Sequence, residues 1–143
     1  MRTLVSLAVA LTLMAGTCNE GKDGGGTPGN ALARLVGSKW VLQTLNGAPI
    51  DQSLGERTPY LQLAEGDKVS GMGGCNQLFG SFTVDGTALK FGELGATKMY
   101  CQDTMELEGK FTSALRATGG YSLDGDVLRL MQGDRELAVL RAQ

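Results

Sequence analysis

The sequence predicts a mostly β, α+β fold, in which one helix packs against a strongly curved antiparallel sheet, or partial barrel, of about eight short strands. Short runs with alternating apolar residues are separated by tight-turn signals such as Asn46-Gly47 and Asp85-Gly86. Only Asp103–Thr118 carries apolar residues at helical spacing. Nearly every other connection is too short for the crossovers of a parallel sheet. We therefore expect a single antiparallel domain over residues 35–143.

The first half of this domain is expected to form one strand and two hairpins. Their strands are expected at Trp40–Leu45, at Tyr60–Ala64 with Val69, and at Gly80–Val84 with Leu89 and Phe91. The second half begins with the helix, where Asp103 and Glu106 have the spacing of a capping box and Gly119-Gly120 ends the pattern. A three-stranded meander at Tyr121–Leu123, Val127–Met131 and Glu136–Leu140 completes the domain.

The first 17 residues are typical of a secretory signal peptide. Arg2 precedes an apolar run from Leu4 to Met14, and small residues follow it. The run is shorter than the roughly 18 to 20 apolar residues of a spanning helix, so we expect export without an integral membrane segment.

Cys18 follows the small residues directly and resembles the acylated first residue of a bacterial lipoprotein. The match is atypical, because Ala15 and Thr17 stand where Leu and Gly, Ala or Ser are usual. Ordinary cleavage after Thr17, giving a soluble periplasmic protein, is the alternative. Asn19 in place of Asp does not suggest inner-membrane retention, which favours the outer membrane. Residues 18–34 are then expected to be a lipidated cysteine and a flexible, glycine-rich tether.

The chain has three cysteines, no histidine and a net charge of −2. No basic patch is present to bind nucleic acid. If Cys18 is acylated in an oxidising compartment, Cys75 and Cys101 remain as an even pair, which favours a structural disulfide worth on the order of 3 to 4 kcal/mol. A redox pair, metal ligands or two buried free thiols are the other interpretations, although the Cys-x-x-Cys spacing of many redox and zinc sites is missing.

The residues around the two cysteines form a structural motif. Gly73 and Gly74 allow a bend that aims Cys75 and Asn76 inward. Asn76 and Thr97 have side chains that commonly bond nearby backbone groups, and we favour that role over ligand binding. Two aromatic residues, Trp40 and Tyr100, could line the mouth of a ligand pocket, but a core position is the more common one for such a residue.

Catalysis finds no support in the sequence. Asp103, Glu106 and Glu108 cluster at the helix start, where capping and the helix dipole explain them. No nucleophile elbow, phosphate loop or calcium-loop pattern occurs. We predict a protein that is not an enzyme, with no catalytic residue, metal site or cofactor.

Several motifs in order resemble the META domain family. They are Trp40-x-Leu42 with Asn46-Gly47, Gly73-Gly74-Cys75-Asn76, Gly80-x-Phe82, Thr97-x-Met99-x-Cys101 and the segment Glu106–Leu115. The resemblance covers about residues 35–140 and implies a small β-rich domain with one helix in the cell envelope. Family members are linked to heat stress and antibiotic tolerance, so the resemblance also implies a stress-related role.

These patterns together predict a monomeric, lipid-anchored envelope protein that binds an unknown envelope protein and contacts the membrane only through its lipid. A carrier or sensor of a small apolar ligand is one alternative, because a curved sheet closed by a helix can enclose a cavity. An inhibitor of an envelope hydrolase, acting through the polar segment Asp51–Thr58, is another.

Overall fold

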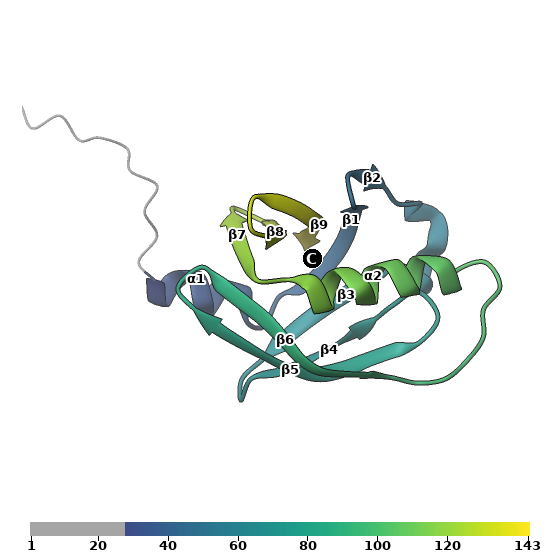
Figure 1. Ribbon diagram of the computed structural model, residues 1–143, viewed down its shortest axis with the longest axis horizontal. Coiled ribbons are helices and arrows are strands. Elements are labelled where there is room, and N and C mark those ends of the chain that lie inside the picture. Colours follow the sequence, from purple (N-terminus) through teal and green to yellow (C-terminus); the bar gives the residue numbers. More distant parts are fainter. Residues whose placement is uncertain (1–27) are drawn as a thin grey trace, which may run out of the picture.

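The computed structural model describes residues 28–143, and the predicted signal peptide, Cys18 and residues 18–27 of the predicted tether lie outside that range. A nine-stranded antiparallel sheet curves around one long helix, with two shorter helical segments beside it (Figure 1). The elements in chain order are α1 (Pro28–Leu35), β1 (Lys39–Leu45), β2 (Ala48–Pro49), the 3-10 helix η1 (Gln52–Arg57), β3 (Tyr60–Ala64), β4 (Lys68–Met72), β5 (Gln77–Asp85), β6 (Ala88–Ala96), α2 (Met105–Ala117), β7 (Gly120–Asp124), β8 (Val127–Gln132) and β9 (Arg135–Ala142).

Neighbouring strands in the sheet follow the order β2-β1-β3-β4-β5-β6-β7-β8-β9, and β1 also pairs with β9. The pairing of β1 with β9 extends from Trp40 opposite Ala142 to Leu45 opposite Ala138, so the sheet curves back on itself. The predicted fold class, a curved antiparallel sheet with a packed helix, is confirmed. The additional strand, β2, has two residues and contains Pro49, so it carries little strand signal in the sequence.

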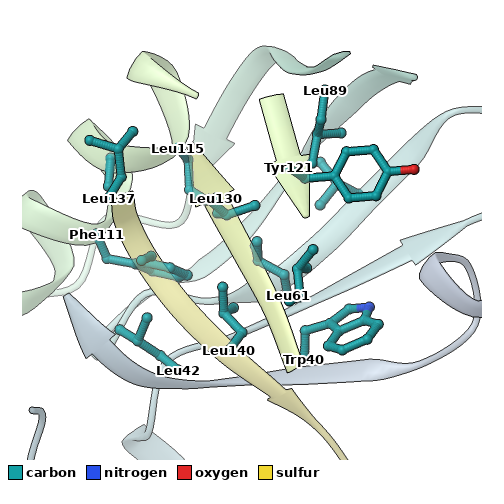
Figure 2. Packing of buried hydrophobic residues seen from close by; sticks show 14 of the residues in the cluster. Trp40, Leu42, Leu61, Leu89, Phe111, Leu115, Tyr121, Leu130, Leu137 and Leu140 are labelled. Carbon is teal, nitrogen blue, oxygen red and sulfur yellow. The ribbon is translucent and has the colours of Figure 1, made fainter. Parts of the chain in front are cut away.

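The core lies between the sheet and α2 (Figure 2). Alternation turns one face of strands such as β3 inward, where Leu61 and Leu63 are fully buried and Gln62 between them is exposed. The helix contributes Phe111, Ala114 and Leu115 to the same cluster. Since burying one large apolar side chain stabilises a fold by about 1.5 to 3 kcal/mol, this cluster is the main source of stability.

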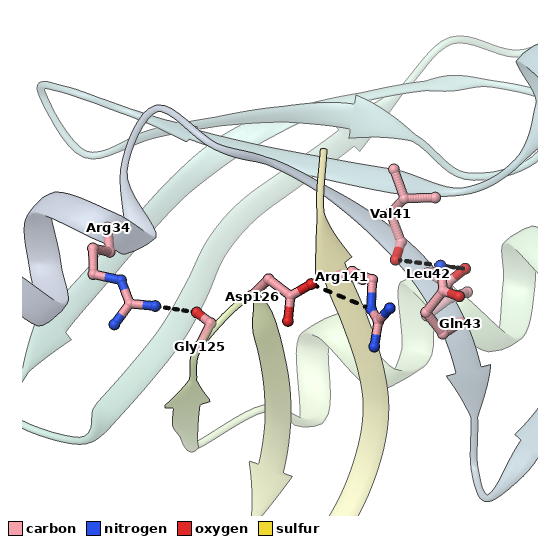
Figure 3. Close-up of polar contacts among 7 residues, drawn as sticks. All are labelled: Arg34, Val41, Leu42, Gln43, Gly125, Asp126 and Arg141. Carbon is pink, nitrogen blue, oxygen red and sulfur yellow. Dashed lines mark hydrogen bonds and ion pairs between the residues drawn. The ribbon is translucent and has the colours of Figure 1, made fainter. Parts of the chain in front are cut away.

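The start of the domain differs from the predicted tether, because residues 28–35 form α1. Leu35 is fully buried, and its carbonyl accepts a hydrogen bond of 2.9 Å from Trp40 Nε1. The Arg34 guanidinium donates to the Gly125 carbonyl in the β7–β8 turn (Figure 3). An apolar side chain in the core and a polar contact to a distant turn fix a segment whose composition resembles that of a linker.

Strands β5 and β6 extend further than predicted, so β5 begins just after Cys75 and β6 ends a few residues before Cys101. Their register shifts near Glu93, which has a φ of 47°, a value typical of a bulge. Beyond the bulge, the ring of Phe79 lies over Gly95, where a Cβ atom would approach it to 2.5 Å. The glycine thus leaves room for an aromatic side chain on the outer face, and β6 continues to Ala96.

Candidate functional site

The candidate site begins with the bend between β4 and β5. The Gly73 N–H donates to the Asn76 carbonyl at 2.9 Å, which closes the turn. Gly74 has a φ of 135°, a conformation that other residues rarely adopt. Cys75 and Asn76 are consequently directed into the protein, where both are buried.

Glu108, from the first turn of α2, holds this bend. Its buried carboxylate accepts hydrogen bonds from the backbone N–H groups of Cys75 at 2.9 Å and Asn76 at 2.5 Å, and from Asn76 Nδ2 at 2.8 Å. A Cβ atom on Gly73 would lie 2.6 Å from Glu108 Cγ, so only glycine leaves space for the carboxylate. The sequence predicts only a local role for Glu108 at the helix start, and no pattern in it indicates this long-range contact.

Asn76 connects the bend to the segment that follows β6. Its Oδ1 accepts hydrogen bonds from the Met99 N–H at 2.6 Å and from Thr97 Oγ1 at 2.9 Å, while its Nδ2 also donates to the Met99 carbonyl at 3.0 Å. Thr97 Oγ1 in turn accepts from the Gln77 N–H at 3.1 Å. With the bond to Glu108, all four hydrogen-bonding positions of the Asn76 amide are used.

A disulfide joins Cys75 to Cys101, with their Cα atoms 5.7 Å apart, which is the pairing that the sequence predicts. It attaches residues 97–104, which we call the 97–104 loop, to the same bend. Thr97, Met99 and Cys101 are therefore each fixed to the bend, the first two by hydrogen bonds and the third covalently.

The 97–104 loop carries exposed apolar side chains. Met99 is 60% exposed and Tyr100 is 80% exposed, and with Phe79 and Leu32 they are the exposed large hydrophobic side chains among residues 30–143. In Figure 1 this loop lies at the opposite end of the view from α1. Trp40, the other aromatic residue considered for a pocket mouth, is a core residue with 1% exposure and does not belong to the site.

The start of α2 differs from the predicted capping box. Thr104, not Asp103, precedes the helix, and no side chain caps it. Glu106 instead forms an ion pair of 2.5 Å with Lys110 one turn later. The hydrogen bond and the positive charge of Lys110 lower the pKa of the Glu106 carboxyl. The buried Thr104 hydroxyl has no hydrogen-bond partner among the described residues.

The space between sheet and helix is filled by side chains. Trp40, Phe82 and Phe111 are at most 3% exposed, and Phe91 packs against them half-buried. One surface groove of about 470 Å³ runs along α2 beside Arg135. Another, of about 380 Å³, lies between α1 and the β3–β4 turn. This packing counts against an internal cavity for a small apolar ligand.

Residues 28–143 contain no cluster of three or more His, Cys, Asp or Glu side chains that could hold a metal ion. Over the same residues, no helix is long and apolar enough to cross a membrane. Both carboxylate oxygens of Glu108 accept hydrogen bonds from protein groups, so we assign this buried side chain a structural role.

Comparisons with known proteins agree with this fold. The family model of the META domain matches residues 33–143. No curated protein matches the chain.

Among solved structures, an NMR structure of a protein from Burkholderia xenovorans is 21% identical, with 99% of this chain and 97% of that one covered and a TM-score of 0.65. A crystal structure of a DUF4847 family protein from Bacteroides vulgatus is 15% identical, with 75% and 93% covered and a TM-score of 0.56. Identities this low indicate a shared fold alone.

Proposed function

Since the chain belongs to the META domain family, we propose that it is a non-catalytic binding protein of the cell envelope that uses the 97–104 loop as its contact surface. The observation that supports this is the rigid presentation of Met99 and Tyr100, which are exposed on backbone fixed by Asn76 and the disulfide. Exposed aromatic and methionine side chains are typical of protein interfaces, and a fixed backbone reduces the entropy lost on binding.

The proposed location rests on the N-terminal sequence. Residues 1–17 direct export, and Cys18 becomes the acylated first residue in the outer membrane. Between Cys18 and α1, a stretch of about ten residues would span up to roughly 35 Å, which lets the domain stand clear of the membrane surface. The protein then meets partners as a monomer, and the family resemblance favours a role under stress.

Metabolic labelling with a palmitate analogue tests the anchor. We expect the wild-type chain to take up label and to have Cys18 as its mature N-terminus, and Cys18→Ser to take up none. An unlabelled protein that begins at Cys18 would instead support the soluble periplasmic alternative. Label that persists in Cys18→Ser would contradict the proposed site.

Site-specific photo-cross-linking tests the contact surface. A benzophenone amino acid replaces Tyr100 in one variant and, as a matched control, replaces Leu32 in another. Both positions carry exposed hydrophobic side chains, but Leu32 lies in α1 at the other end of Figure 1. We expect a discrete adduct in cells from position 100 alone, reduced when Met99→Ser is added. Equal adducts from both positions, or none from position 100, would refute the proposed surface.

The two alternatives have less support. The filled interior disfavours a carrier of small apolar ligands, as described above. For a hydrolase inhibitor, the segment Asp51–Thr58 contains the mostly exposed 3-10 helix η1. Asp51 caps this helix and accepts hydrogen bonds from the Ser53 N–H and hydroxyl. These bonds lower the pKa of the Asp51 carboxyl but indicate no target enzyme.

A further inference from the structure

We propose that, among the described residues 28–143, Met99 is the residue that hydrogen peroxide modifies first, and that its oxidation to the sulfoxide makes the exposed surface of the 97–104 loop more polar. The modification site follows from exposure and geometry and is independent of any partner. Its effect on binding rests on the proposed function.

Exposure distinguishes Met99 from the other described methionines. Its side chain is 60% exposed, whereas Met72, Met105 and Met131 are half-buried. Oxidation of methionine depends on access of the oxidant to the thioether sulfur. Peroxide in solution therefore reaches the Met99 sulfur without any opening of the fold.

The exposure of Met99 is built into the structure. Asn76 binds both the N–H and the carbonyl of Met99, and the disulfide fixes Cys101 two residues later. The side chain thus cannot retreat into the core by a local shift of the backbone. Such a position differs from a frayed end, where exposure varies with local motion.

The neighbouring cysteines do not compete for the oxidant. Both cysteines within residues 28–143 are joined in the disulfide, so neither carries a thiol that peroxide could oxidise to a sulfenic acid. Among the described side chains, the exposed thioether is therefore the sulfur most open to oxidation.

The chemistry is a transfer of one oxygen atom. The thioether sulfur attacks one peroxide oxygen and the O–O bond breaks, while the proton of the transferred oxygen passes to the departing hydroxide. The sulfur is thereby oxidised to a sulfoxide and the second peroxide oxygen leaves as water. Reduction of the sulfoxide back to the thioether is a separate reaction that consumes a dithiol, which becomes a disulfide as the sulfoxide oxygen leaves in water. The sulfoxide carries a strong dipole, so it disfavours burial against an apolar partner surface.

Peptide mapping by mass spectrometry tests the site. The full chain is treated with hydrogen peroxide below one equivalent, and sulfoxide is quantified at Met72, Met99, Met105 and Met131. We expect Met99 to be oxidised several times faster than the other three, with an unchanged circular dichroism spectrum. Faster oxidation at any other described methionine would overturn the proposal.

Two variants test whether oxidation at Met99 is what weakens binding. Met99→Leu keeps an exposed apolar side chain but cannot be oxidised, and Met105→Leu removes a half-buried methionine from α2 as the matched control. With the cross-linker at position 100, we expect peroxide to reduce the adduct in wild type and in Met105→Leu but not in Met99→Leu. An equal reduction in Met99→Leu would show that Met99 does not control binding. If no adduct forms in any protein, the proposed function fails, whereas the mapped oxidation site is judged on its own.

Discussion

The meander β7–β9 and the region around the disulfide are stabilised by different means. Along the meander, Leu128, Leu130 and Leu140 are fully buried, and tight turns such as the one at Gly125 join the strands. The disulfide region is built around Gly73 and Gly74, and it depends on the Glu108 carboxylate, the Asn76 amide and a covalent bond. A segment with few apolar side chains can therefore be fixed if every polar group finds a partner.

The largest expected effect comes from a substitution in the meander, the region that is stabilised by buried apolar side chains. Leu130→Ala removes a fully buried side chain from β8 and should lower the free energy of unfolding by about 3 to 4 kcal/mol. Urea denaturation measures the loss. Arg129→Ala, next to it, removes only a partly exposed ion pair with Glu136 and should cost less than about 1 kcal/mol. Similar losses in the two variants would show that the meander is not stabilised mainly by burial.

Removing the disulfide tests the second region, around Cys75 and Cys101. The double variant Cys75→Ala and Cys101→Ala opens a loop closed across 26 residues, and the loop-closure model predicts a loss of about 3.5 kcal/mol. The rate of hydrogen exchange should increase first in the 97–104 loop. The amides of β8 should still exchange only through global unfolding of the domain. Uniform acceleration throughout the domain would mean that the two regions form one cooperative unit.

A pair of glycine substitutions sharpens the comparison. Gly73→Ala pushes the Glu108 carboxylate away from its three donors, and we expect a loss of about 2 kcal/mol. Gly109→Ala, one residue beyond Glu108 in α2, places its Cβ in open space and should stabilise the protein by about 0.5 to 1 kcal/mol. Thermal unfolding should give opposite shifts in midpoint temperature. Shifts of the same sign would contradict the role given to Glu108.

The smallest effect concerns the exposed pair of Glu106 and Lys110. The lowered pKa of Glu106 means that the pair contributes stability above the ordinary glutamate pKa of about 4.3, and that this contribution is lost as pH falls through the lower pKa of the folded state. Comparing wild type with Glu106→Gln by denaturation from pH 7 to pH 3 should give a small difference that disappears in acid. A difference that grows in acid would contradict the assignment.

Much of the fold could be predicted because its signals are local. The turns at Asn46-Gly47 and Asp85-Gly86 and the alternation along β3 determine where strands begin, end and face. The α1 helix was missed because Pro28 and Gly29 resemble a linker, and its stability depends on the burial of Leu35 by distant strands. The full length of β6 was missed because Gly92 and Gly95 weaken its strand pattern.

The site was predicted only in part. Cysteine parity, on the premise that Cys18 is acylated, favours the pairing of Cys75 with Cys101, and this disulfide is confirmed. The partnership of Glu108 with the bend joins residues more than thirty positions apart, and a glutamate near a helix start has a sufficient local explanation. The exposure of Tyr100 depends on the path of the 97–104 loop, which its sequence alone does not determine.

The pairing of strands around the curved sheet has a mechanical consequence. Strands β6 and β7 share a single register pair, Ala88 with Gly120, whereas β1 and β9 are paired along most of their length. The circuit of paired strands therefore has one weakly paired junction, between β6 and β7. Local opening of the sheet should begin between β6 and β7, while β1 and β9 remain paired.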